Sequence, residues 1–193
     1  LGLLGPRTQC VHMTSLTDED IDLLRSSNSH VIHCPRSNMK LASGISPVDR
    51  LLKAGVNVAL GTDGAASNNR LSMLGELQMA ALLAKLESLE ATALSATAAL
   101  EVATLGGARA LGLEATVGSI ETGKAADLIA LDLSQPHSQP LNNIVSQIVY
   151  ANNGTELTHS WVAGQPLVRD GKPLTLAPAE ISARVARWPE KFK

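Results

Sequence analysis

The chain has 193 residues, 45% of them hydrophobic, and a formal net charge of −2. A chain of this kind can bury a sizeable core, and its slightly acidic balance gives no electrostatic footprint for nucleic acid or for an anionic membrane surface. The aromatic residues are two Trp, one Tyr and one Phe, so no platform for stacking bases is expected.

The amino-terminal residues do not resemble a targeting segment. Pro6 and Arg7 interrupt the first apolar residues, and no apolar run approaches the length of a membrane span. The two cysteines, Cys10 and Cys34, fall in strand-like runs, which favours buried, reduced thiols. We therefore expect a soluble, cytoplasmic protein with no membrane or nucleic-acid partner.

Three short apolar runs are typical of buried strands, and helical segments with short connections join them. This alternation predicts right-handed βαβ units and a parallel sheet. The third run ends in Gly61-Thr62-Asp63-Gly64 and then in a loop of small and amide residues. The predicted strands are residues 9–13, 30–34 and 56–60.

Capping residues mark the predicted helices. Thr17 is a natural N-cap and Asp20 can close a capping box, while Ser46 and Pro47 predict the start of the next helix. Between these helices, residues 36–44 are predicted to form a long polar loop. Apolar residues at helical spacing predict further helices over residues 72–88, 93–105 and 108–111.

The sequence becomes mostly β-like after residue 112. We predict a strand, a turn and a strand over residues 117–132, further strands over 145–150 and 157–162, and a hairpin with an Asp-Gly turn over 164–171. A surface helix is predicted from Ala179 to Pro189. The predicted organisation is an α/β segment over 1–112, a β-rich segment over 113–176 and a tail over 177–193.

Polar side chains follow the ends of the predicted parallel strands. His12 lies at the end of the first strand, His33 to Asn38 span the end of the second, and Asp63 follows the third. The carboxyl ends of parallel strands open on one face of a barrel, and imidazole with carboxylate is the usual ligand and proton-carrier set of a hydrolytic metal site. His30, His137 and His159 are interpreted as core or surface residues without chemistry.

Several motifs carry a resemblance to a known family. The residues Val11-His12-Met13, the run Cys34-Pro35-Arg36-Ser37-Asn38 and the stretch Gly61-Thr62-Asp63-Gly64 resemble the amidohydrolase superfamily. More narrowly they resemble its 5′-methylthioadenosine/S-adenosylhomocysteine deaminase branch, close to the triazine chlorohydrolases. The resemblance continues through residues 103–112, which look like the helix that closes the barrel, and residues 118–128, which look like the family's β-sandwich domain.

The resemblance implies the C-terminal part of a (β/α)₈ barrel, strands six to eight, followed by part of a small β-sandwich domain. It implies one divalent metal, usually zinc. Asp63 matches the last-strand aspartate that ligates the metal, handles the proton of the attacking water and meets the substrate. His12 matches the sixth-strand histidine that orients the water and stabilises charge. Ser67 matches a position that lines the substrate pocket, with a simple turn residue as the alternative.

The implied reaction is deamination of the adenine ring of methylthioadenosine or adenosylhomocysteine to the inosine analogue and ammonia. Another hydrolysis on the same scaffold is the alternative within enzymes, such as guanine deamination or triazine dechlorination. A non-catalytic binding module is the alternative outside enzymes. Ser37 and Asn38 could touch substrate, but such residues more often bond their own backbone, and we expect that of them here.

The sequence departs from the family pattern by what it lacks. The family also needs a His-x-His pair on the first strand and a fifth-strand histidine followed by a glutamate, and none of these occurs here. A (β/α)₈ barrel takes ~250 residues, and three strands would leave open edges. We therefore expect the C-terminal portion of a longer protein, neither active nor stable without a partner that supplies the first half of the barrel. The resemblance also suggests homo-oligomers.

Overall fold

The computed structural model describes residues 2–152 and 154–188. Contacts divide the chain into two compact units, the first made of Leu1–Lys124 and Leu133–Gly154 and the second of Ala125–Asp132 and Thr155–Lys193. The first unit holds a parallel sheet and the second an antiparallel sheet, so the chain is α/β with two separate sheets. The boundaries between these units fall after residues 124, 132 and 154, whereas the sequence predicts domain boundaries at residues 112 and 176. The predicted domain boundaries stay predictions.

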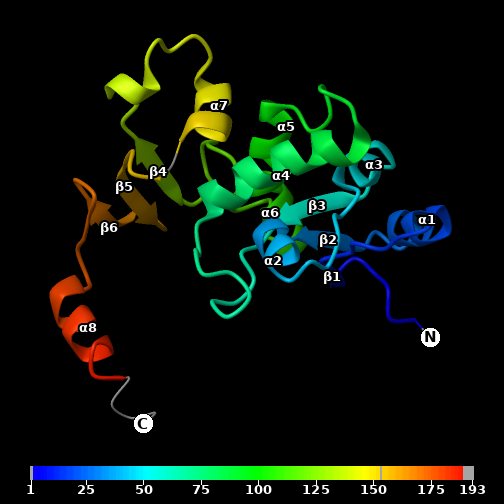
Figure 1. Ribbon diagram of the computed structural model, residues 1–193, viewed down its shortest axis with the longest axis horizontal. Helices are drawn as coiled ribbons and strands as arrows, with labels where there is room; N and C mark the ends of the chain where they lie inside the picture. Colours follow the sequence, from blue (N-terminus) through cyan, green and yellow to red (C-terminus); the bar gives the residue numbers. More distant parts are fainter. Residues whose placement is uncertain (1, 153, 189–193) are drawn as a thin grey trace. The chain divides into compact units, whose positions relative to one another are not determined.

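The sheet of the first unit has three parallel strands in the order β1-β2-β3, as predicted. In its register Val11, Ile32 and Ala59 lie side by side on one face, and Cys10, Val31 and Val58 lie side by side on the other. Val31 and Val58 are buried against the helices and belong to the core. The strands are β1 (Gln9–Val11), β2 (His30–His33) and β3 (Asn57–Leu60) (Figure 1).

Helix α1 (Asp18–Ser26) begins as its capping residues predict. The Thr17 hydroxyl accepts from the Asp20 amide, and the Asp20 carboxylate accepts from the Thr17 amide. Helix α3 (Val48–Lys53) begins one residue later than predicted: Pro47 occupies the N-cap, and no side chain caps this end. The prediction that Ser46 caps this helix is therefore wrong, because Ser46 is buried before the helix starts.

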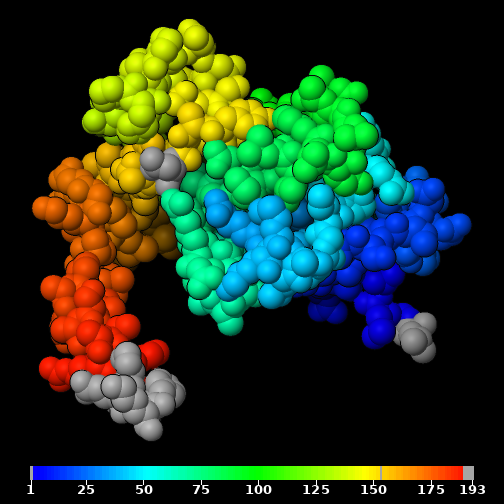
Figure 2. Space-filling model, viewed as in Figure 1, coloured from blue at the N-terminus to red at the C-terminus, as the bar shows by residue number. Residues whose placement is uncertain are grey.

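The predicted polar loop after β2 is wrong in part, because Pro35–Lys40 form helix α2. Pro35 stands at the start of this helix, where its fixed φ suits the first turn. Ser37 and Asn38 are buried in α2 and are bonded to distant side chains rather than to their own backbone alone. Figure 2 shows the atoms of α2 packed against those of the next long helix, α4 (Met73–Ser88).

Helix α4, the π-helical turn η1 and helix α6 pack against strand β3. Helix α4 matches the prediction, and the Ser72 hydroxyl caps it by accepting from the Gly75 amide at 3.2 Å. The helix predicted over 93–105 starts later and continues as a π-helical turn, where Gly106 lies so close to β3 that an added Cβ would be 2.4 Å from the Val58 carbonyl oxygen. The elements are α5 (Ala96–Glu101), η1 (Val102–Gly106) and α6 (Gly107–Leu111).

Two predicted strands of the first unit do not form. The segment predicted as a strand over 145–150 is helical, with α7 (Ile144–Ser146) followed by the π-helix η3 (Gln147–Ala151). Its β-branched residues favour a strand locally, but Val149 is fully buried and η3 packs on α4, so tertiary packing overrides the local preference. Residues 117–120 form no strand either, and Gly118 takes a φ of 94° that suits a turn. The short 3₁₀ helix η2 is Pro136–Ser138.

The second unit is an antiparallel sheet in the order β4-β5-β6-β7. The Asp170-Gly171 turn joins the last two strands, and both residues have positive φ, as a tight hairpin turn of this kind requires. Helix α8 (Pro178–Val185) lies where the tail helix is predicted, although the predicted stop at Pro189 lies outside the described residues. The strands are β4 (Leu128–Leu131), β5 (Leu157–Val162), β6 (Gln165–Arg169) and β7 (Lys172–Pro173).

None of the helices in the described residues is long and apolar enough to cross a bilayer.

Candidate active site at the carboxyl edge of the parallel sheet

Two of the predicted site residues lie just past the ends of parallel strands. His12 follows β1, and its amide still donates to the Ile32 carbonyl of β2 at 3.0 Å. Asp63 follows β3 after two residues. Both adopt left-handed backbone conformations, with φ of 73° and 58°. Such conformations cost about 1 kcal/mol or more in residues with a side chain and concentrate at functional sites.

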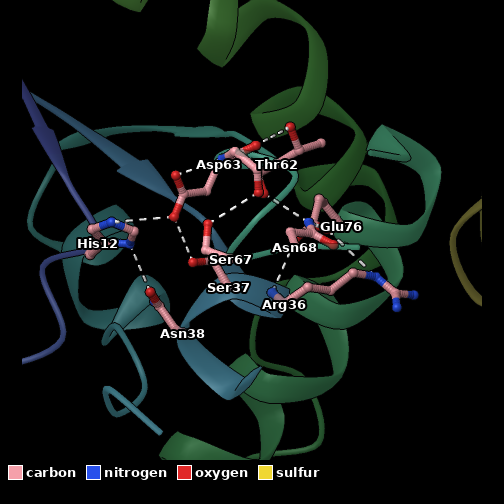
Figure 3. Close-up of polar contacts among 10 residues, drawn as sticks. His12, Arg36, Ser37, Asn38, Thr62, Asp63, Ser67, Asn68 and Glu76 are labelled. Carbon is pink, nitrogen blue, oxygen red and sulfur yellow. Dashed lines mark hydrogen bonds and ion pairs between the residues drawn. The ribbon is translucent and has the colours of Figure 1, made fainter. Parts of the chain in front are cut away.

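The structure brings the His12 and Asp63 side chains together. The His12 Nε2 atom is 3.8 Å from Asp63 Oδ2, and the two side chains are 41% and 32% exposed. Figure 3 shows the imidazole ring and the carboxylate pointing toward one another. Ser67 lies in the loop after Asp63, where its hydroxyl donates to the Gly64 carbonyl at 3.1 Å. Its turn-stabilising role is therefore present, and its contact with substrate stays a prediction.

Helix α2 supplies a partner for each of these side chains. The Ser37 hydroxyl donates to Asp63 Oδ2 at 2.6 Å, and the Asn38 Oδ1 atom lies 2.8 Å from His12 Nδ1. With the amide oxygen as acceptor, the histidine proton is held on Nδ1 and the Nε2 atom is turned toward Asp63. Sequence reasoning assigned Ser37 and Asn38 to local backbone bonds, so it missed both contacts. Their adjacency just after a strand end was the available signal.

The surroundings of Asp63 stabilise its ionised form. The Ser37 hydroxyl contributes most, followed by the nearby Ser67 hydroxyl and the Gly64 amide, and together they lower the pKa of Asp63 to about 2. The Gly64 amide donates to Asp63 Oδ1 at 2.7 Å. Asp63 is thus a carboxylate at neutral pH, with both oxygens engaged by hydrogen-bond donors.

Two residues beside the site are buried and uncharged. The His33 ring is 1% exposed, and neither ring nitrogen has a hydrogen-bond partner among the described residues. Burial, with a smaller effect of nearby His12, lowers the pKa of His33 to about 4. Burial also raises the pKa of the Cys34 thiol to about 11. Cys34 is thus an unreactive thiol at neutral pH, and both Cys10 and Cys34 are free, as expected.

His30 and His159, two of the histidines interpreted as core or surface residues, make contacts of their own. His30 is held at the opposite end of β2, where its Nδ1 faces the Asn57 amide at 3.0 Å and its Nε2 the Pro6 carbonyl at 3.1 Å. His159 stacks on Trp161 in the second unit, with ring centroids 5.4 Å apart. Neither contact suggests catalytic chemistry.

The site fits part of a metal centre. An ionised, accessible aspartate with a histidine nearby matches the oxygen and nitrogen donors that zinc accepts. Within residues 2–152 and 154–188, however, no three His, Cys, Asp or Glu side chains are grouped closely enough to hold a metal ion. Asp63 therefore fits as one ligand of such a centre.

Comparisons with known proteins identify the family of this chain. The model of the amidohydrolase family matches residues 1–167. A 5-methylthioadenosine/S-adenosylhomocysteine deaminase from Teredinibacter turnerae is 54% identical over 192 residues, which cover all of this chain and 43% of that protein. The chain therefore spans less than half the length of this curated relative.

Solved structures show the same partial match. A zinc-bound adenosine deaminase from Xanthomonas campestris superposes with a TM-score of 0.96 and 46% identity over 98% of this chain and 43% of that one. The zinc complex of an atrazine chlorohydrolase from Arthrobacter aurescens has a TM-score of 0.88 and 26% identity over 94% of this chain and 40% of that one.

The chain belongs to the amidohydrolase family.

Proposed function

We propose that this chain is the C-terminal part of a zinc-dependent aminohydrolase that deaminates the adenine ring of 5′-methylthioadenosine or S-adenosylhomocysteine. In this proposal β1, β2 and β3 are strands six to eight of a (β/α)₈ barrel, and the second sheet belongs to a small β-sandwich domain. The single observation that supports it most is the pairing of His12 and Asp63 at the carboxyl edge of the parallel sheet, 3.8 Å apart. The 54% identity to the Teredinibacter deaminase favours this substrate over a triazine.

The roles of the chain's own residues follow from their contacts. Asp63 would hold the metal, which would act as a Lewis acid and lower the pKa of a bound water toward about 7. Asp63 is ionised and accessible, so it can also accept a proton from the attacking water. His12 presents Nε2 on the same side and, when protonated, donates a hydrogen bond that stabilises negative charge on the tetrahedral adduct. Ser67 lines the pocket in this proposal.

The reaction adds water to C6 of the adenine ring and releases ammonia. A proton leaves the attacking water and reaches the departing amino group, so one carboxylate can serve both transfers. Such proton transfers contribute about 10²- to 10⁴-fold to a rate. We infer that the first half of the barrel, with the remaining ligands, must be supplied for this reaction, whether by the same polypeptide or by another one.

The test is a joined protein, in which the amino-terminal part of the Teredinibacter deaminase precedes this chain. We expect it to bind about one equivalent of zinc and to release ammonia from methylthioadenosine. The variant Asp63→Asn should lower kcat by about 10²- to 10⁴-fold and reduce zinc content. The control Asp22→Asn removes an exposed carboxylate on α1 that forms an ion pair with Arg25, and it should change neither quantity.

Other outcomes would overturn the proposal. A folded joined protein that binds zinc but releases chloride from a chlorotriazine, and not ammonia from the nucleoside, would favour the chlorohydrolase alternative. A folded joined protein that binds no zinc would favour a non-catalytic binding module. Full activity in Asp63→Asn would contradict the role given to this carboxylate.

A further inference from the structure

A buried carboxylate lies behind the candidate site and takes no part in the proposed reaction. Glu76 stands in the first turn of α4, and its side chain is 0% exposed. Removing a carboxylate from water costs several kcal/mol unless hydrogen bonds and opposite charge compensate for it. Such a group calls for a structural or functional reason.

The two oxygens of Glu76 bind two different segments. Oε2 accepts a hydrogen bond from the Arg36 backbone amide at 3.1 Å, and Oε1 accepts one from the Asn68 side-chain amide at 2.8 Å. The Arg36 guanidinium adds charge, with Nε 3.5 Å from Oε1. Figure 3 shows Glu76 next to Arg36 and Asn68, on the other side of Asp63 from His12.

The first of these segments carries both partners of the candidate catalytic residues. Arg36 lies in the first turn of α2, directly before Ser37 and Asn38. Ser37 holds Asp63 and Asn38 faces His12, so the position of this turn sets the position of both contacts. Glu76 holds this turn by the hydrogen bond that it accepts from the Arg36 backbone amide. A change of side chain at position 36 would leave that amide in place.

The second segment carries Asp63 itself. The same Asn68 amide nitrogen that binds Glu76 also donates to the Thr62 carbonyl at 2.8 Å, next to Asp63 in the chain. Asn68 also accepts from the Arg70 amide at 3.1 Å, which fixes the orientation of its amide group. Glu76 therefore reaches the backbone beside Asp63 through one buried side chain, because Asn68 is only 3% exposed.

We propose that Glu76 is a positioning residue: its buried carboxylate ties the first turn of α2 to the loop after β3 and so fixes the relative placement of His12 and Asp63. Its effect on catalysis rests on the proposed function, whereas its effect on geometry does not. Both acceptor positions are needed, since each oxygen faces an N–H donor. Glutamine has a single side-chain oxygen and would turn an NH₂ group toward one of these donors.

The experiment compares three variants of the joined protein. Glu76→Gln keeps the shape and breaks one of the two bonds. Asn68→Asp combined with Glu76→Gln exchanges the donor and the acceptor between positions 68 and 76. The NH₂ group of the glutamine at position 76 can then donate to the new carboxylate at position 68, and the glutamine oxygen can accept from the Arg36 amide. The carboxylate at position 68, however, has no N–H left to donate to the Thr62 carbonyl. Glu101→Gln is the matched control, because Glu101 is a half-exposed carboxylate paired with Arg109 at 3.0 Å.

A positioning role predicts a particular pattern of kinetic and stability changes. Glu76→Gln should lower kcat by about 10- to 100-fold, because a misplacement of about 1 Å can cost 100-fold, with KM changed less than about twofold. The double variant should recover part of the thermal stability lost in Glu76→Gln but not kcat, since the Thr62 contact stays broken. Glu101→Gln should change neither. Recovery of both quantities in the double variant, or native kcat in Glu76→Gln, would overturn the proposal.

A crystal structure of the Glu76→Gln joined protein provides a readout that does not depend on activity. We expect the Ser37 Oγ to Asp63 Oδ2 distance, 2.6 Å here, to lengthen beyond hydrogen-bonding range. If Glu76→Gln does not fold, the double variant is used for this measurement, with the same expectation. An unchanged distance would refute the positioning role even if the joined protein deaminates methylthioadenosine. A lengthened distance in a joined protein that deaminates nothing would support positioning and refute the proposed function.

Discussion

The buried His33 ring makes the stability of the protein depend on pH in a way that can be measured. Its pKa is about 4 in the folded chain, against an ordinary value of 6.5. Between these pH values the unfolded state binds a proton that the folded state does not, so the free energy of unfolding falls as pH falls. The free energy of unfolding falls by about 1.4 kcal/mol per pH unit in this range, and by about 3 kcal/mol in all between pH ~6.5 and pH ~4. Above pH ~6.5 the ring is neutral in both states and adds no pH dependence.

The perturbation is the variant His33→Leu, which fills the site with an apolar side chain that cannot bind a proton. Urea unfolding of the joined protein, native and variant, is followed from about pH 7 to about pH 4. Other groups titrate in this range in both proteins, so the difference between the two curves isolates His33. We expect the native protein to lose about 3 kcal/mol more than the variant over this range. The control Leu51→Val changes a fully buried residue of the same core that binds no proton, so it should lower stability without changing the pH dependence.

Parallel curves for the native protein and His33→Leu would refute this reasoning. They would mean that the ring is protonated as readily in the folded protein as in water. The burial of both ring nitrogens without partners, which is the physical cause of the lowered pKa, would then be wrong.

Two further predictions concern single contacts. In the metal-free joined protein, Ser37→Ala removes the main group that lowers the pKa of Asp63, so the pKa of this carboxyl, followed by NMR titration, should rise; an unchanged pKa would contradict this. Gly106→Ala places a Cβ 2.4 Å from the Val58 carbonyl and should cost about 1–3 kcal/mol in thermal or urea unfolding. Gly107→Ala meets nothing within 4 Å and should be neutral or stabilising by up to about 1 kcal/mol, and equal effects at both glycines would refute the argument.

Local signals in the sequence were enough for the parallel sheet and for several helix ends. The three strands are short apolar runs with clear stops, and their alternation with helices allows few topologies. Thr17 and Asp20 form their capping box within four residues, so no distant contact is needed to predict it. The approach of His12 to Asp63 was also predictable, because the carboxyl ends of parallel strands meet at one edge whatever the details of packing.

Where distant contacts compete with local preference, the sequence was a poor guide. The residues of η3 favour a strand by composition, yet packing on α4 makes them helical. The second half of the predicted β-rich region therefore contains fewer strands than expected. The domain boundaries placed near residues 112 and 176 depend on such packing and stay predictions.

The sequence by itself determined the family, the parallel strands and the two side chains at their ends. Only the tertiary structure decided what holds those side chains. Ser37 contacts Asp63, and Asn38 contacts His12, each across 26 residues, while Glu76 reaches Arg36 across 40. Hydrogen bonds between segments this far apart leave no periodic or capping pattern in the sequence, because they depend on where three separate elements pack.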